Sequence, residues 1–239
     1  MAKGHFVEEL TWPELERYIE QQFTAILPIG AGSKEHGLHL PLATDAIQVN
    51  WLCRQIIQSH KVLVWPTLTY GYYPAFTEFP GSTSLSHQNF NLLLDDVVAA
   101  IAGNGCHLGF ILNSGISTIE SVDRASTKNP VFDPLHIYRG EVFQDTVQRL
   151  CQQTNGGHAD EVETSLMLHI APDSVQLSQA VDESRQSFVA GRLNRNQPEL
   201  PNHTASGAMG NPTLASAAKG RLLADAMLTD VRLTLDAAL

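Results

Sequence analysis

The sequence has few charged residues, few cysteines and no long hydrophobic run. Only 17% of its 239 residues are Asp, Glu, Lys or Arg, which is a low fraction for a globular protein. This fraction is typical of a surface that partner subunits cover, or of one rich in Ala, Ser and Gln. The net charge of −10 and the lack of a Lys/Arg cluster with interleaved aromatics argue against nucleic-acid binding.

The three cysteines, Cys53, Cys106 and Cys151, are far apart and odd in number. They predict neither a disulfide framework nor a zinc ribbon, and we expect them to be packing residues rather than nucleophiles. No apolar run approaches the length of a membrane span. The first ten residues lack the apolar core of a secretory signal, so we expect a cytoplasmic protein without membrane contacts.

The chain does contain an alternation of strand and helix patterns. Apolar strand patterns fall at residues 24–30, 61–66 and 108–113, and helical patterns fall at 11–23, 45–60, 87–105, 158–172 and about 214–238. Such an order predicts right-handed crossovers and a mostly parallel sheet with helices on both faces. We therefore expect one domain over residues 1–239, of the α/β class, built as a three-layer α/β/α sandwich.

Residues 30–45, GAGSKEHGLHLPLATD, follow the first predicted strand directly. Ligands in open α/β sheets bind outside the carboxyl ends of the strands, which is where Glu35, His36, His39 and Asp45 should lie. Each of these residues alone is explained by an ordinary loop or by a helix N-cap. Together they favour a metal site, because mixed histidine and carboxylate ligands suit zinc, manganese or iron(II).

Four segments resemble the creatininase (creatinine amidohydrolase) family. They are LPIGAGSKEHGLHLPLATD at 27–45, FPGSTSL at 79–85, GGHADEVETSLML at 156–168 and SGAMGNPTLASAAKG at 206–220. The resemblance implies an α/β/α sandwich, a centre of one or two divalent ions (zinc, manganese or iron), and a homo-oligomer, often a hexamer. It also implies hydrolysis of a carbon–nitrogen bond in a small molecule, such as a cyclic amide or formamide, by a metal-bound hydroxide.

The resemblance further implies roles for particular residues. Glu35, His36, Asp45 and Glu163 are the candidate metal ligands, with Asp45 as the bridging one. His158 falls on the position that passes a proton to the leaving nitrogen, and Glu163 acts there as ligand or base. Because a spacing of five does not place two side chains on one helix face, His158 should lie just before the helix that contains Glu163.

Two departures from the family pattern put one metal site in doubt. Glu35 touches His36 directly, where the family has one residue between glutamate and histidine, and Lys34 occupies the place two before His36. The third strand ends ILNSGISTIE, without the histidine that the family uses as a ligand. The alternative to an enzyme is therefore a catalytically degraded member that binds a ligand or partner, although the retained ligand and proton-transfer residues favour the enzyme.

Other polar and aromatic residues near these motifs have weaker predictions. We expect His39 to form hydrogen bonds or to be structural rather than to bind metal. An aromatic cluster could line a substrate pocket or form a packing or subunit contact, and we favour contact; its members are Tyr70, Tyr72, Tyr73, Phe76 and Phe79.

Overall fold

A computed structural model describes residues 2–184 and 191–238 and contains one five-stranded sheet. The strands are β1 (His5–Phe6), β2 (Thr24–Ile29), β3 (Val62–Val64), β4 (Gly109–Asn113) and β5 (Phe132–His136). Their order across the sheet is β1-β3-β2-β4-β5, and every neighbouring pair is parallel. The central strand, β2, is buried along its whole length, which explains its nearly continuous apolar sequence.

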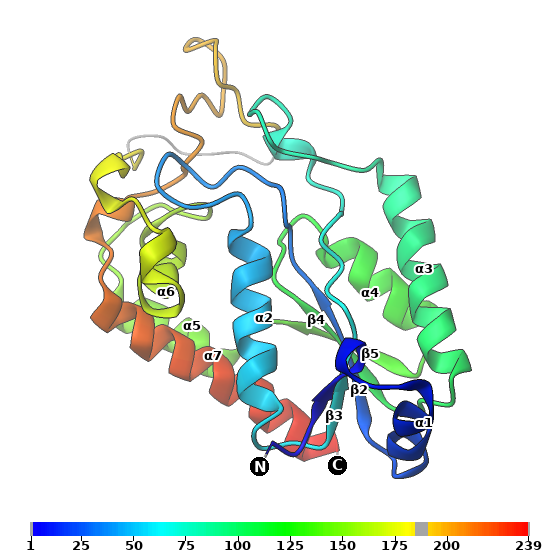
Figure 1. The fold of residues 1–239 in the computed structure, drawn as a ribbon. Coiled ribbons are helices and arrows are strands. Elements are labelled where there is room, and N and C mark those ends of the chain that lie inside the picture. The colour runs from blue at the N-terminus through cyan, green and yellow to red at the C-terminus, as the bar shows by residue number, and fades with distance from the viewer. Residues whose placement is uncertain (1, 185–190, 239) are drawn as a thin grey trace.

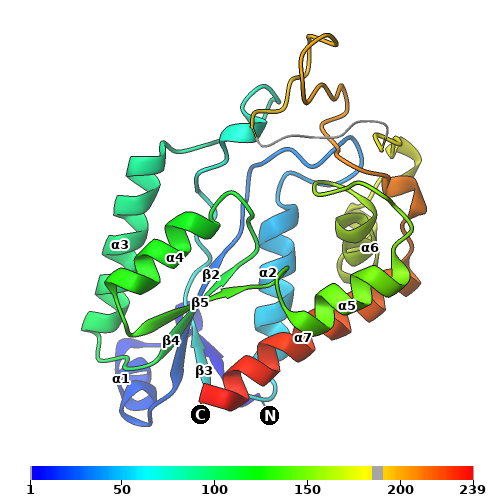
Figure 2. The same cartoon turned by 180° about the vertical axis from the view of Figure 1, so that it is seen from behind.

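Helices cover both faces of this sheet (Figures 1 and 2). One layer contains α2 (Thr44–Ile56), α5 (Glu141–Leu150), α6 (Glu161–Ile170) and α7 (Ala217–Ala238), and the other contains α3 (His87–Gly103) and α4 (Ile119–Lys128). The short α1 (Trp12–Glu20) packs near the second layer through Ile19. The expected three-layer α/β/α sandwich is therefore confirmed. None of the helices described is both long and apolar enough to cross a membrane.

Two apolar cores lie between these layers. Ile26 of β2 belongs to the core that packs against α2 and α7, whereas Leu27 and Ile29 belong to the core that packs against α3 and α4. This division follows from the strand geometry, because successive side chains of a strand point to opposite faces. Both cores thus fix β2, and with it the loop that begins at residue 30.

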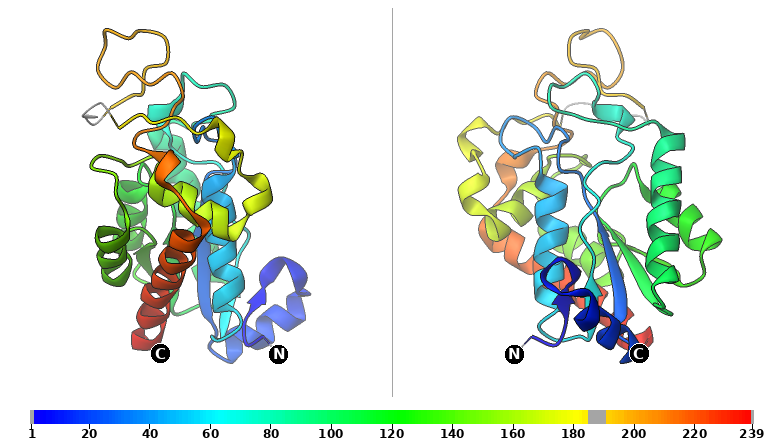
Figure 3. Two further views of the ribbon diagram at one scale, coloured as in Figure 1. Left: turned by 90° about the vertical axis from the view of Figure 1, so that its left-hand side faces the viewer. Right: turned by 45° about the vertical axis from the view of Figure 1, so that its right-hand side comes forward.

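Most of the predicted elements are present. The first helix begins as the sequence indicates, because the Glu14 carboxylate accepts hydrogen bonds from the backbone N–H (2.8 Å) and the hydroxyl (2.6 Å) of Thr11. The elements missed by the sequence patterns are β1, α4, β5 and α5. The loops that follow β2, β3 and β4 gather beyond the carboxyl ends of the strands, and both chain termini lie at the opposite end of the molecule (Figure 3).

Candidate active site

The loop after β2 carries Glu35 and His36 to the carboxyl edge of the sheet and leads into α2, which begins at Thr44. Asp45 is the second residue of α2, and both it and His36 are fully buried. The loop is supported by the FPGSTSL segment, because the backbone N–H of Glu35 donates to the hydroxyl oxygen of Ser82 (2.9 Å). The first and second of the family-like segments therefore lie against each other.

His158 lies in the loop before α6, and Glu163 lies in the first turn of that helix, as the sequence predicts. Asp160 is the N-cap: its Oδ1 accepts the backbone N–H groups of Val162 (2.9 Å) and Glu163 (3.1 Å). Its Oδ2 accepts the N–H of Gly157 (2.9 Å). These bonds satisfy the free donors at the helix start and fix the position of the Glu163 side chain relative to His158.

The fourth family-like segment, residues 206–220, contacts His158 through backbone hydrogen bonds. The N–H of Met209 donates to the carbonyl oxygen of His158 (2.8 Å), and the N–H of His158 donates back to the carbonyl oxygen of Met209 (3.4 Å). The third and fourth family-like segments thus meet at His158.

His36, His158 and Glu163 bring three metal-binding side chains together. One ligand atom of each lies within 4.8 Å of the others, and all three residues are buried. Nδ1 of His36 lies 2.9 Å from the carbonyl oxygen of Lys34, so this nitrogen donates. Nε2 lies 3.0 Å from Oδ1 of Asp45, and it is the nitrogen that would face an ion in place of that contact. Histidines that bind metals are commonly held in this way through the second ring nitrogen.

In His158 the two ring nitrogens have the opposite roles to those in His36. Its Nε2 lies 2.8 Å from the carbonyl oxygen of Glu35, so Nε2 carries the proton, and Nδ1 faces a carboxylate oxygen of Glu163 at 3.6 Å. The available donors are therefore two imidazole nitrogens and a carboxylate. This donor set fits one divalent ion such as zinc, manganese or iron.

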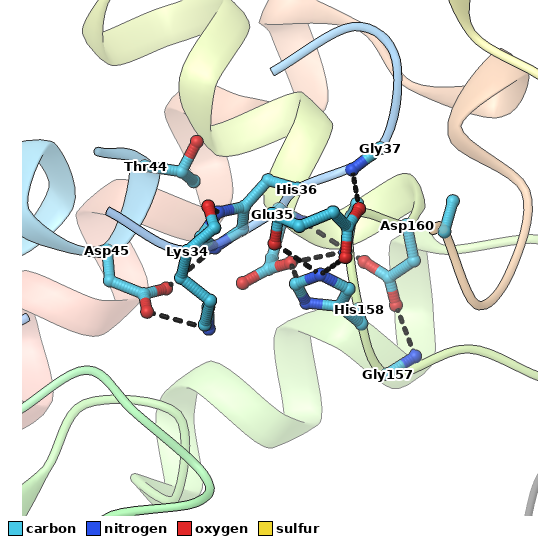
Figure 4. Close-up of polar contacts among 12 residues, drawn as sticks. Lys34, Glu35, His36, Gly37, Thr44, Asp45, Gly157, His158 and Asp160 are labelled. Carbon is cyan, nitrogen blue, oxygen red and sulfur yellow. Dashed lines mark hydrogen bonds and ion pairs between the residues drawn. The ribbon is translucent and has the colours of Figure 1, made fainter. Parts of the chain in front are cut away.

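The Glu35 carboxylate faces His158. Its Oε2 lies 3.1 Å from Nε2 of His158, and its Oε1 accepts the backbone N–H of Gly37 (Figure 4). Burial alone would lower the pKa of His158, but the charge of Glu35 raises it above the ordinary histidine value. Burial would likewise raise the pKa of Glu35, but His158 lowers it. The pair therefore favours a charged, fixed imidazole when no ion is present.

The Asp45 carboxylate is shared by Lys34 and His36. Oδ2 lies 2.7 Å from Nζ of Lys34, and Oδ1 lies 3.0 Å from Nε2 of His36 (Figure 4). Burial alone would raise the pKa of Asp45, but Lys34 and His36 together lower it well below its usual range. Asp45 therefore stays ionised. The sequence motifs did not predict a role for Lys34 in the site. Its position two residues before His36 was the one feature that could have indicated such a role.

The loop after β4 contains no histidine, and its polar groups bond to the fold itself. The Ser114 hydroxyl donates to the carbonyl oxygen of Ile29 (3.0 Å), and the Thr118 hydroxyl donates to Oδ1 of Asn113 (2.7 Å). Glu120, the carboxylate that follows, is exposed on α4 and is not part of the three-residue cluster. Within the part of the chain that the structure describes, nothing from this loop replaces the absent histidine.

A cavity of about 570 Å³ opens beside the cluster. Lys34, His158 and Glu163 line it on one side, and the loop after β4 forms another wall. The remaining lining is largely apolar and includes Phe76, Ile116, Phe143 and Val147. A mainly apolar cavity of this size with a few convergent polar groups is typical of a small-molecule site.

The aromatic cluster divides between the two predicted roles. Phe76 lines the cavity and places its ring 4.4 Å from the ring of His158. Tyr73 and Phe79 are buried and pack in the same small core as Phe76, whereas Tyr70 is 57% exposed. One member thus shapes the cavity, and others stabilise the loop that carries it.

His39 and the cysteines lie outside the three-residue cluster. Nε2 of His39 lies 2.7 Å from the hydroxyl oxygen of Thr164, as expected for a hydrogen-bonding residue. Burial raises the pKa of the Cys53 thiol to about 12 and that of Cys106 to about 11. Thiols with such pKa values remain protonated at neutral pH, which agrees with packing roles.

Comparisons with known proteins point to one family. The family model "Creatininase: Creatinine amidohydrolase" matches residues 8–234. The chain is 28% identical to the creatinine amidohydrolase of Pseudomonas putida over 93% of each chain. It is 25% identical to the mycofactocin precursor peptide peptidase of Mycobacterium tuberculosis, over 86% of this chain and 81% of that protein.

Solved structures agree with these relatives. A structure described as "Creatininase Mn" superposes with a TM-score of 0.79 and 25% identity, over 98% of each chain. A creatininase variant described as "Zn-Zn type" has the same TM-score, identity and coverage. These descriptions name manganese and zinc, which are divalent ions that the donor set described above can bind.

Proposed function

This chain belongs to the creatininase family, and we propose that it uses one divalent ion, bound by His36, His158 and Glu163, to hydrolyse a small molecule. Family membership and the similarity to creatinine amidohydrolase make it a hydrolase of carbon–nitrogen bonds. The observation that carries the proposal is the buried three-donor cluster beside a cavity of about 570 Å³.

When bound, the ion supplies Lewis acidity for the substrate's carbonyl oxygen and for the attacking water. The chain holds the ligands in place: Glu35 fixes His158, and the carbonyl oxygen of Lys34 fixes His36. The N–H of Gly37 is already bonded to Glu35, so it is not free to stabilise an oxyanion. We propose His158 as a ligand through Nδ1, because its Nε2 proton points to Glu35 rather than to the cavity lining.

The substrate that we propose is a small cyclic amide or formamide. The size and apolar lining of the cavity support a compact substrate, as does the relative that acts on creatinine. The peptidase relative favours a second candidate, which is the end of a short peptide. Arg139 and Gln144 also line the cavity and could hydrogen-bond to a carboxylate or carbonyl group of either substrate.

The test is a metal-dependence assay with a matched carboxylate control. Chelator-treated protein would be reconstituted with zinc or manganese and assayed on creatinine, other cyclic amides, formamides and short peptides. Glu163→Gln should lose the bound ion and the activity, because a neutral amide is a poor ligand for a divalent cation. Asp225→Asn, the same change at an exposed position of α7, should retain both.

Two results would contradict the proposal. Activity that survives complete removal of the ion would exclude the metal-dependent chemistry. A folded chain that binds no ion and turns over no substrate in the panel would instead support the binding role predicted for a degraded family member.

A further inference from the structure

A buried lysine neutralises the carboxylate that the family resemblance assigns as the bridging metal ligand. Asp45 is 0% exposed and Lys34 is 5% exposed, and a carboxylate or an ammonium in such a position needs a partner of opposite charge. Nζ of Lys34 lies 2.7 Å from Oδ2 of Asp45. The ammonium is also enclosed by aromatic rings, at 4.9 Å from the ring centre of Phe76 and 5.9 Å from that of Tyr73.

The described residues provide no second complete set of metal ligands. Among them, the one group of three or more His, Cys, Asp or Glu side chains close enough to share an ion is His36, His158 and Glu163. Asp45 is outside this group, and the Glu35 carboxylate is engaged by His158 and Gly37. A two-ion centre, as in the creatininase described as Zn-Zn type, would therefore need ligands that this loop does not provide.

Lys34 and a second ion would also exclude each other. A zinc ion bound to Oδ2 of Asp45 would lie about 2.0–2.2 Å from that oxygen. The Lys34 nitrogen already lies 2.7 Å from the same oxygen, so the ion and the ammonium would compete for it. Their charges would in addition repel strongly at such a distance in a buried site.

We propose that the ammonium of Lys34 takes the place of a second metal ion, so that the centre combines one exchangeable divalent ion with one fixed organic cation. Asp45 holds this cation instead of bridging two ions. Lys34 lines the cavity, and an ammonium has three N–H donors, of which Asp45 needs one. The others can donate to a carbonyl or carboxylate oxygen of the substrate.

This inference rests on the proposed metal site, and its test compares ion counts rather than activities. Chelator-treated wild type and variants would be titrated with Zn²⁺ or Mn²⁺, and the ions per chain counted by native mass spectrometry. Lys34→Glu replaces the cation by a carboxylate beside Asp45 and should bind one ion more than wild type. Lys61→Glu makes the same change at an exposed position and should bind the same number as wild type.

The outcomes separate the two proposals. A wild type that binds two ions, or a Lys34→Glu variant that binds no more than wild type, overturns the inference about Lys34. A wild type that binds none contradicts the proposed metal site, while an added ion in Lys34→Glu still supports the exclusion by Lys34. If Lys34→Glu does not fold without metal, Lys34→Gln replaces it. Its melting temperature should then rise more than that of wild type on addition of ion, and an equal rise would overturn the inference.

Discussion

The imidazole of His158 and the carboxylate of Glu35 lie 3.1 Å apart although 123 residues separate them in the chain. This contact joins the segment after β2 to the start of α6 and sets which nitrogen of His158 carries a proton. It therefore decides whether His158 can act as a ligand through Nδ1.

His158→Gln tests that role. If His158 is a ligand, the variant should lose the bound ion, and turnover should be lost with it. If His158 instead delivers the proton to the leaving nitrogen, the ion should be retained while turnover falls by about two to four orders of magnitude. Ion content and turnover measured on the same preparation distinguish the two, and a variant that keeps both would exclude His158 from the chemistry.

Glu35→Gln is the companion variant. It leaves all three proposed ligands in place but removes the charge that holds His158. Loss of such a supporting carboxylate typically weakens metal affinity by about 10- to 100-fold, and we expect a decrease of this size in a zinc or manganese titration. An unchanged affinity would show that the contact between Glu35 and His158 does not support ion binding.

Gly207→Ala should displace Glu35 without changing any charged group. Gly207 has a φ of +89°, and a Cβ there would clash with Oε1 of Glu35. We expect a loss of stability of about 2 kcal/mol or more from the backbone strain and the clash, together with weaker ion binding. Denaturant unfolding and ion titration would measure the two effects.

Gly103→Ala is the matched control for that experiment. Gly103 is the last residue of α3, and a Cβ there would meet nothing within 4 Å. The change should stabilise the fold by a few tenths of a kcal/mol up to about 1 kcal/mol and leave ion binding unaltered. Equal effects of the two substitutions would contradict the packing of Gly207 against Glu35.

His39 should make the fold sensitive to mild acid. Burial lowers the pKa of His39 to about 4, against 6.5 for an ordinary histidine. Between these two pH values the unfolded chain binds a proton at His39 and the folded chain does not. The stabilising effect of the neutral form is complete above about pH 6.5 and is lost as the pH falls toward 4. Protonation of His39 should lower the free energy of unfolding by about 2 kcal/mol by pH 4.5.

His39→Gln removes the titrating group while keeping a hydrogen-bonding side chain near Thr164. The free energy of unfolding, measured between pH 7 and 4.5, should fall less steeply for the variant than for wild type. Parallel pH profiles would show that His39 is not the group responsible.

The sequence patterns predicted the strands that are buried along their whole length and missed the strands that are partly exposed. The central strands β2 and β4 are buried throughout, so their apolar runs were clear. β5 contains Pro134 and exposes Asp133, as an edge strand can, and its sequence therefore resembles a loop. α4 has a narrow apolar face, so few of its residues indicated a helix.

The site was predictable in its residue types but not in its pairings. The motif of residues 30–45 indicated a metal centre, and His36 and Glu163 lie in the three-donor cluster. The pairing of Lys34 with Asp45 depends on how the loop folds back onto α2, and no spacing in the sequence shows this. The position of Glu35 against His158 likewise depends on contacts between segments far apart in the chain.

Oligomer formation remains a prediction, and Ile116 provides a specific test of it. Ile116 is 63% exposed and also lines the cavity, so a partner subunit that covers it would close the cavity wall. Together with the low charge fraction, this leads us to expect a homo-oligomer, possibly a hexamer of the 26.1 kDa chain, in sedimentation experiments at micromolar concentration.

Ile116→Asp should shift the sedimentation distribution toward smaller species, because burying an unpaired charge at an interface core costs about 2 kcal/mol or more, or about thirtyfold in dissociation constant. Leu233→Asp makes the same change on α7, where the side chain is 57% exposed and does not line the cavity, and it should leave the distribution unchanged. The activity of Ile116→Asp should fall with its oligomer content, since the partner would complete the cavity wall. A wild type that sediments as a monomer, or an oligomer that Ile116→Asp leaves intact, would contradict this arrangement.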